Sequence, residues 1–180
     1  MLDWDNEHNE IGKGYVTLYI PDYNEEDGMI DSFNLEKLDY IVKKLYRNFH
    51  HFEHPENKEV LIGLNSDSFT GDTSDKHNLF MEWDRKYGLP NLDKLRKAEG
   101  VISQTDNGFH FIKEDWLTLE ELVKIQKEWK CCKGFIKHTE EMDYACLRVS
   151  PKKDNVINII DYRDGLLYNV YKTMVLGLGG

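Results

Sequence analysis

The chain has 180 residues, of which 33 are acidic and 23 basic, giving a formal net charge of −10. This length allows one substantial hydrophobic core with a smaller subdomain beside it. No apolar run is long enough to span a membrane and the acidic start does not match a signal peptide, so we expect a cytoplasmic protein without a membrane partner. Cys131, Cys132 and Cys146 are odd in number and include an adjacent pair, which excludes a disulfide framework.

The negative charge argues against nucleic-acid binding, but it is unevenly distributed. Between Lys124 and Lys153 there are eight basic and four acidic residues. Such a basic strip can hold a phosphate backbone, and it is equally typical of a solvated helix face. The charge pattern therefore leaves both readings open.

Residues 1–78 predict an N-terminal α/β unit. Residues 15–20 have the pattern of a strand, Asn34 is placed to cap a helix with apolar residues at helical spacing over 35–49, and residues 60–64 predict a second strand. A polar loop follows at 65–78. The run His50-His51-Phe52-Glu53-His54 could ligate zinc, but histidines at the end of a helix also suit its dipole, and we favour the helix end.

Residues 79–180 predict a sheet with one polar face. In the strand 79–84, Met81 and Trp83 point to one face while Glu82 and Asp84 point to the other, because side chains alternate along a strand. A short helix around 92–98 and a strand at 101–104 follow. These elements give the sheet an apolar side, which helices can cover, and an acidic side.

The next segment contains two strong local signals. Asn107-Gly108 lies between apolar runs and predicts a hairpin into a strand at 109–112, in which His110 faces away from Phe109 and Phe111. Thr118 to Glu121 fits a capping box that opens a helix running to about Trp129. Residues 144–150 predict the last strand of this unit.

The element order is βαββαβ, which is the split βαβ arrangement used by RNA-recognition modules. We therefore expect an α+β fold with an RRM-like antiparallel sheet, the palm, in which the first strand lies between the third and the fourth. This order would place Glu82 and Asp84 between His110 and Arg148. Residues 156–162 and 166–170 flank Arg163-Asp164-Gly165 and predict a C-terminal β-hairpin that completes one compact unit.

The polar face has the chemistry of a cation and phosphate site. Two carboxylates one residue apart on a strand can share a hard divalent cation, although alternating acids are also common on exposed sheets. Arg148, Ser150 and Lys152 supply positive charge and a hydroxyl at the exit of the last strand, while Ser103 and Thr105 supply hydroxyls near His110. Cys131, Cys132 and Cys146 with His138 do not have a zinc-site spacing.

Three stretches resemble the motifs of the archaeo-eukaryotic primase superfamily, the primase–polymerases. Phe80-Met81-Glu82-Trp83-Asp84 resembles its acidic strand, Ser103-Gln104-Thr105-Asp106-Asn107-Gly108-Phe109-His110 its hydroxyl-and-histidine motif, and Leu147-Arg148-Val149-Ser150-Pro151-Lys152 its basic stretch. The resemblance covers about 74 residues in the expected order. It implies a nucleotidyltransferase of DNA replication that joins nucleoside triphosphates to the 3′ end of a strand on a DNA or RNA template.

The resemblance also implies roles for individual residues. Glu82 and Asp84 would bind Mg²⁺ or Mn²⁺ and act in catalysis with a third acid, for which we take Asp143. Nucleotide would be bound by Ser103, Thr105, His110, Arg148, Ser150 and Lys152. The implied partners are nucleoside triphosphates, single-stranded or primed nucleic acid, and other replication proteins.

Two departures from the family's motifs keep other functions open. Glu82 stands where the family usually has aspartate, and Glu140 and Asp161 compete with Asp143 for the third acid. Without a third acid, two-metal chemistry lacks ligands, so the alternatives are an inactive relative that binds nucleotide or nucleic acid and an acidic protein-interaction domain. A rolling-circle endonuclease would need a second histidine where Ile112 stands.

Overall fold

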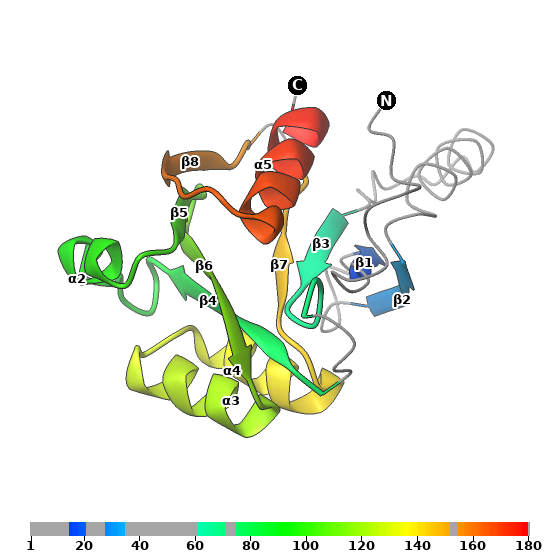
Figure 1. The fold of residues 1–180 in the computed structure, drawn as a ribbon, viewed down its shortest axis with the longest axis horizontal. Helices are drawn as coiled ribbons and strands as arrows, with labels where there is room; N and C mark the ends of the chain where they lie inside the picture. Colours follow the sequence, from blue (N-terminus) through cyan, green and yellow to red (C-terminus); the bar gives the residue numbers. More distant parts are fainter. Residues whose placement is uncertain (1–14, 21–27, 35–60, 71–74, 152–154, 180) are drawn as a thin grey trace.

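The computed structural model describes residues 15–20, 28–34, 61–70, 75–151 and 155–179, and over these ranges it is an α+β structure with two four-stranded antiparallel sheets. The first sheet has the order β2 (Gly28–Asn34), β1 (Tyr15–Ile20), β3 (Leu61–Asn65), β7 (Cys146–Arg148). The second has the order β4 (His77–Asp84), β6 (Gly108–Leu117), β5 (Val101–Gln104), β8 (Asn158–Asp161). The described helices are α2 (Leu92–Lys97), α3 (Leu119–Glu128), α4 (Lys133–Met142) and α5 (Leu166–Gly179) (Figure 1).

Most elements with a local sequence signal form as predicted. The strand at 15–20 is β1, the strand at 60–64 is β3 shifted by one residue, and the hairpin at Asn107-Gly108 joins β5 to β6. The capping box of α3 is complete, since Thr118 Oγ1 accepts from the Glu121 amide at 3.2 Å and the Glu121 carboxylate accepts from the Thr118 amide at 2.8 Å. The helix predicted over 35–49 and the His50 to His54 run lie outside the described residues.

The strand order differs from the predicted one. β4 pairs with β6 as expected, but β7 pairs with β3 in the first sheet, where Gly63 lies opposite Arg148. The outer edge of β4 is instead closed by the α3–α4 region, because Gln126 Nε2 donates to the Phe80 carbonyl at 3.0 Å and the Cys132 amide donates to the Glu82 carbonyl at 2.9 Å. These bonds occupy the backbone carbonyls of β4 to which a neighbouring strand would have to pair.

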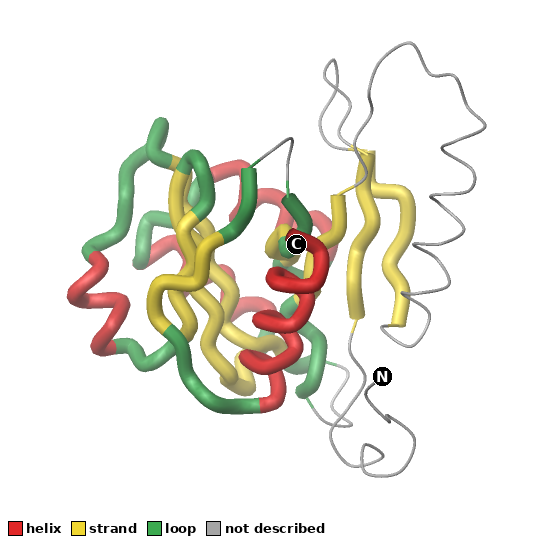
Figure 2. The backbone as a smooth tube through the Cα atoms, turned by 90° about the horizontal axis from the view of Figure 1, so that it is seen from above, coloured by secondary structure: helices red, strands yellow, loops and turns green. Residues whose placement is uncertain are grey.

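The pairing of β3 with β7 also joins the two predicted units, because one strand comes from residues 1–78 and the other from residues 79–180. One hydrophobic core includes Ile62 and Leu64 of β3 together with side chains from both faces of the second sheet. In Figure 2, the strands of the first sheet stand side by side next to the helix-covered second sheet.

The predicted C-terminal hairpin is wrong in its second half. Residues 158–161 form β8, but residues 166–179 form α5. The buried side chains of α5 recur at helical spacing, and they are Leu167, Tyr168, Val170, Tyr171, Met174 and Val175. A five-residue apolar window such as 166–170 fits a strand or a helix, and only the continuation to residue 175 reveals the helical period.

Helices cover both faces of the second sheet. Met81, Trp83 and Phe111 are buried on the face that α3 and α4 cover, where Trp83 Nε1 donates to the Trp129 carbonyl at 2.9 Å. α5 lies over the other face, which carries Glu82 and His110 (Figure 1). The sequence predicted an open polar face here, and the structure places part of that face under a helix.

Candidate functional site

The predicted site residues form a row across three neighbouring strands. Glu82 of β4 lies opposite His110 of β6, which in turn lies opposite Ser103 of β5. We call Glu82, His110 and Ser103 the polar row. The Glu82 carbonyl accepts from the Cys132 amide and so points away from β6. Glu82 and His110 therefore form a non-hydrogen-bonded pair, in which the two Cα atoms are about 4.5 Å apart. The predicted convergence of Glu82 and His110 on one face is confirmed.

Asp84 extends this face at the end of β4. It lies opposite Gly108, and its Oδ1 accepts from the Lys86 amide at 2.8 Å. A Cβ atom on Gly108 would collide with the Trp83 carbonyl, so only glycine lets β4 and β6 approach so closely here. The hairpin glycine thus holds Asp84 in register with the polar row.

The row is accessible at one end and buried at the other. Glu82 and Asp84 are partly exposed, whereas His110 is 4% and Ser103 1% exposed. Burial, together with the positive charge of Arg148, lowers the pKa of His110 to about 3. His110 is therefore a neutral imidazole at ordinary pH, and its Nδ1 has no hydrogen-bond partner among the described residues.

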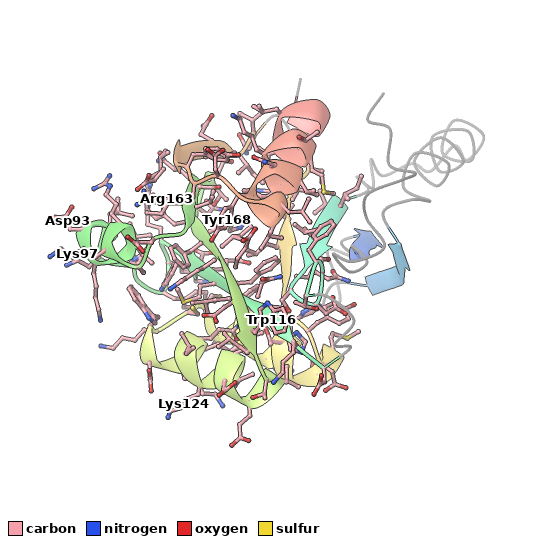
Figure 3. All side chains as sticks on the ribbon, in the orientation of Figure 1. Asp93, Lys97, Trp116, Lys124, Arg163 and Tyr168 are labelled. Carbon is pink, nitrogen blue, oxygen red and sulfur yellow. The ribbon has the colours of Figure 1, made fainter. Side chains whose placement is uncertain are left out.

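α5 covers the buried end of the row. Tyr171 is fully buried, and its hydroxyl donates to Ser103 Oγ at 3.0 Å. Burial raises the pKa of Tyr171 to about 12, so the hydroxyl keeps its proton. At the start of α5, Glu114 Oε1 accepts from the Leu167 amide at 3.0 Å and the Glu114 amide donates to the Tyr168 hydroxyl at 2.8 Å. Figure 3 shows Tyr168 reaching from α5 toward the sheet.

Arg148, on β7 of the first sheet, acts on the row through its charge. It is partly buried, and its charge acts on both His110 and Tyr171. Its Nη1 donates to the Ser150 carbonyl at 2.5 Å, which holds the guanidinium near the end of β7. On the facing strand a Cβ at Gly63 would collide with Cys146 Sγ, so a larger residue there would force the Cys146 side chain to move. Arg148 is the predicted phosphate ligand that the fold brings to the row.

Other predicted ligands have structural partners of their own. Ser150 is buried and its Oγ accepts from the Ile62 amide at 2.8 Å, which ties β7 to β3. Thr105 Oγ1 accepts from the Gly108 amide at 3.1 Å within the β5–β6 turn. Lys152 lies outside the described residues.

The three candidates for the third acid lie away from Glu82. Asp143 ends α4 and acts electrostatically on His77, the first residue of β4. His77 lies five residues before Glu82, about 17 Å away at the rise of a β-strand. Glu140 pairs with Lys127 at 2.6 Å on the helical side of the sheet. Asp161 lies on β8, three strand spacings of about 4.8 Å each from β4.

His77 belongs to a second buried polar cluster, at the far end of β4. Its Nδ1 lies 3.0 Å from Ser66 Oγ, which also accepts from the Ala145 amide at 2.9 Å. Burial lowers the pKa of His77, while Asp143 and Asp75 raise it. Ser66 is completely buried, so this cluster joins the β3–β4 loop to β7 and offers no accessible nucleophile.

The acids on the polar face fit one divalent cation better than two. Mg²⁺ is commonly held by one or two carboxylates with substrate phosphates and waters completing its shell, and Glu82 and Asp84 match that pattern. A pair of ions needs more negative ligands close together. Over the described ranges, no group of three His, Cys, Asp or Glu residues is arranged to hold a metal ion.

Tyr171 is a residue that the sequence reasoning missed. Its signal was the helical spacing of apolar residues from 167 to 175, and the strand predicted at 166–170 cut this pattern in two.

No protein-family model, curated protein or solved structure matches the chain. None of the described helices combines the length and hydrophobicity that crossing a membrane requires.

Proposed function

We propose that the chain binds a nucleoside triphosphate together with one divalent cation, Mg²⁺ or Mn²⁺, at the accessible end of the polar row. The observation that carries this proposal is the shared face of Glu82 and Asp84 with His110 and Ser103, with Arg148 close to His110. A triphosphate is repelled by two carboxylates unless a cation lies between them, so cation and nucleotide bind together. This site is of the kind that the primase–polymerase motifs imply.

The charge states of His110 and Arg148 indicate which residue would contact the phosphates. His110 is neutral at ordinary pH and cannot attract phosphate oxygens by charge, whereas Arg148 carries a positive charge that acts on the row. His110 lies opposite Glu82 on the neighbouring strand β6, as a neutral neighbour of that carboxylate. Ser103 is covered by Tyr171 and supports the row from its buried end.

The placement of the acids favours binding over polymerisation. Asp143, Glu140 and Asp161 are all remote from Glu82, so the described residues offer ligands for one cation. Nucleotidyl transfer to a primer 3′ end, with a role in DNA replication, is the second candidate function. This second function is favoured by the common face of the residues that resemble the primase–polymerase motifs. A primer-extension assay with Mn²⁺, nucleotides and a primed template tests it.

Titration calorimetry tests the binding proposal directly. We expect the triphosphate to bind wild type only with Mn²⁺ or Mg²⁺ present, and Glu82→Gln to lose about tenfold or more in affinity, because a cation ligand is removed while the side-chain shape is kept. Glu120→Gln is the matched control, since Glu120 is an exposed acid on α3 away from the row. Equal affinity of wild type and Glu82→Gln would contradict the proposal.

A further inference from the structure

A basic and aromatic surface adjoins the accessible end of the polar row. Five of the thirteen residues from Arg85 to Lys97 are basic and one is acidic, in a chain whose net charge is −10. We call Arg85, Lys86, Tyr87, Lys94, Lys97 and Trp129 the β4–α2 surface. Figure 1 shows α2 and the loop before it at the outer side of the molecule, away from α5.

Tyr87 is presented to solvent by a well-bonded turn. Its side chain is 64% exposed, and Lys86 Nζ lies 5.4 Å from the ring centroid. The turn is fixed to the polar face, because the Lys86 amide donates to Asp84 Oδ1 at 2.8 Å and the Tyr87 amide donates to the Asp84 carbonyl at 2.9 Å. A large aromatic ring held outward in this way has a free face for stacking.

A second aromatic ring lies where α2 meets the end of α3. Lys94 Nζ lies 4.6 Å from the Trp129 ring centroid, and Trp129 is in edge contact with the buried Trp83. The contact links α2 to the end of α3. Lys97 lies on the same short helix as Lys94, a few residues after Tyr87 in the chain.

Most of the positive charge on this surface is uncompensated. Arg96 pairs with Asp93 at 3.1 Å, but Arg85, Lys86 and Lys97 make no ion pair with any described carboxylate. Figure 3 shows Lys97 directed outward from α2. These three side chains are available for phosphate groups of a partner.

We propose that the β4–α2 surface binds single-stranded nucleic acid, with a base stacked on Tyr87 and phosphates on Arg85, Lys86 and Lys97. An exposed aromatic ring among unpaired cations suits a strand that offers both bases and phosphates, whereas a purely acidic peptide would use the charges alone. The inference rests on the proposed function in one respect: the turn starts at Asp84, so the strand would end beside the nucleotide.

On this surface a bound strand would lie away from the sheet face. In the primase–polymerases that the motifs resemble, the sheet itself cradles nucleic acid, but here α5 covers that face, with six buried side chains of its own and with the Tyr171 hydroxyl bonded to Ser103. Binding a strand on that face would require α5 to move and expose apolar side chains, which is unfavourable. The edge formed by the β4–α2 surface is open without any such change.

The test is fluorescence anisotropy with labelled oligodeoxythymidylate and wild-type protein in EDTA, where no cation-bound triphosphate contributes. Tyr87→Ala should weaken binding about fivefold to a hundredfold because it removes one stacking platform, and Tyr87→Phe should retain it. Lys97→Gln should make the slope of log K against log salt shallower by about 0.7. Lys124→Gln, an equal loss of charge on the exposed side of α3, should change neither quantity measurably.

The outcomes separate this inference from the proposed function. Oligonucleotide binding that depends on Tyr87 supports the surface even if no triphosphate binds. Absence of oligonucleotide binding by wild type overturns it, whatever the calorimetry shows. Binding that is equal in wild type and Tyr87→Ala, or equally strong for polyglutamate, also overturns it, because the surface would then recognise charge without bases.

Discussion

At the scale of single residues, the neutral state of His110 links stability to pH. The unfolded chain protonates this imidazole near pH 6.5 and the folded chain only near pH 3, so unfolding takes up a proton between these values. Stability should fall as the pH falls through this window, by about 1.4 kcal/mol per pH unit from this residue. His110→Phe, which keeps a ring without a proton site, should be less sensitive to acid.

Urea denaturation at several pH values from neutral to acid checks this expectation. The informative quantity is the difference between wild type and His110→Phe, because other groups such as His77 titrate in both proteins. Parallel stability curves for the two proteins would show that His110 is not held neutral by its surroundings.

A substitution at Ser150 tests whether this residue stabilises the fold or binds the nucleotide. Its Oγ accepts from the buried Ile62 amide, so Ser150→Ala leaves that donor unsatisfied and should cost about 1–3 kcal/mol of unfolding free energy. We expect the triphosphate affinity to stay unchanged. Urea denaturation gives the first quantity and calorimetry the second, and a large loss of affinity without a loss of stability would restore Ser150 to the binding site.

At the scale of elements, α5 is anchored by Tyr171 through both its ring and its hydroxyl. Tyr171→Phe removes only the bond to Ser103 and should cost about 1 kcal/mol, whereas Tyr171→Ala leaves a cavity and should cost about 3–5 kcal/mol. Thermal and urea denaturation of the two variants measure the difference. Equal small losses would mean that Tyr171 is not packed against the sheet.

Elements with a local chemical signature could be predicted from the sequence. Thr118 and Glu121 fix the start of α3, and Asn107-Gly108 fixes the β5–β6 turn, because both signals depend on backbone groups a few residues apart. α5 was mistaken for a strand because Arg163-Asp164-Gly165 suggests a hairpin turn and the helical period shows only when the window extends to residue 175. α4 was missed because Cys132 gives it no side-chain cap and its apolar face is narrow.

At the scale of the whole molecule, long-range pairing could not be derived from the sequence. The convergence of Glu82 with His110 was predictable because both follow from strand alternation and one hairpin. The pairing of β7 with β3 was not, because it joins Gly63 to Arg148 from distant parts of the chain, and nothing local marks the edge of β4 as occupied by Gln126 and Cys132. The same limit applies to the acids, since sequence order cannot reveal that Asp143 lies beside His77.

The central claim is that a divalent cation and a triphosphate bind beside Glu82 and Asp84, and paramagnetic NMR tests it most directly. Mn²⁺ with a triphosphate, added to ¹⁵N-labelled protein, broadens the amide signals of nearby residues. We predict that the signals of Glu82, Asp84 and Gly108 broaden first, while those of Ser66 and Asp143 at the other end of β4 persist. Uniform broadening, or broadening centred on Asp143, would contradict the account.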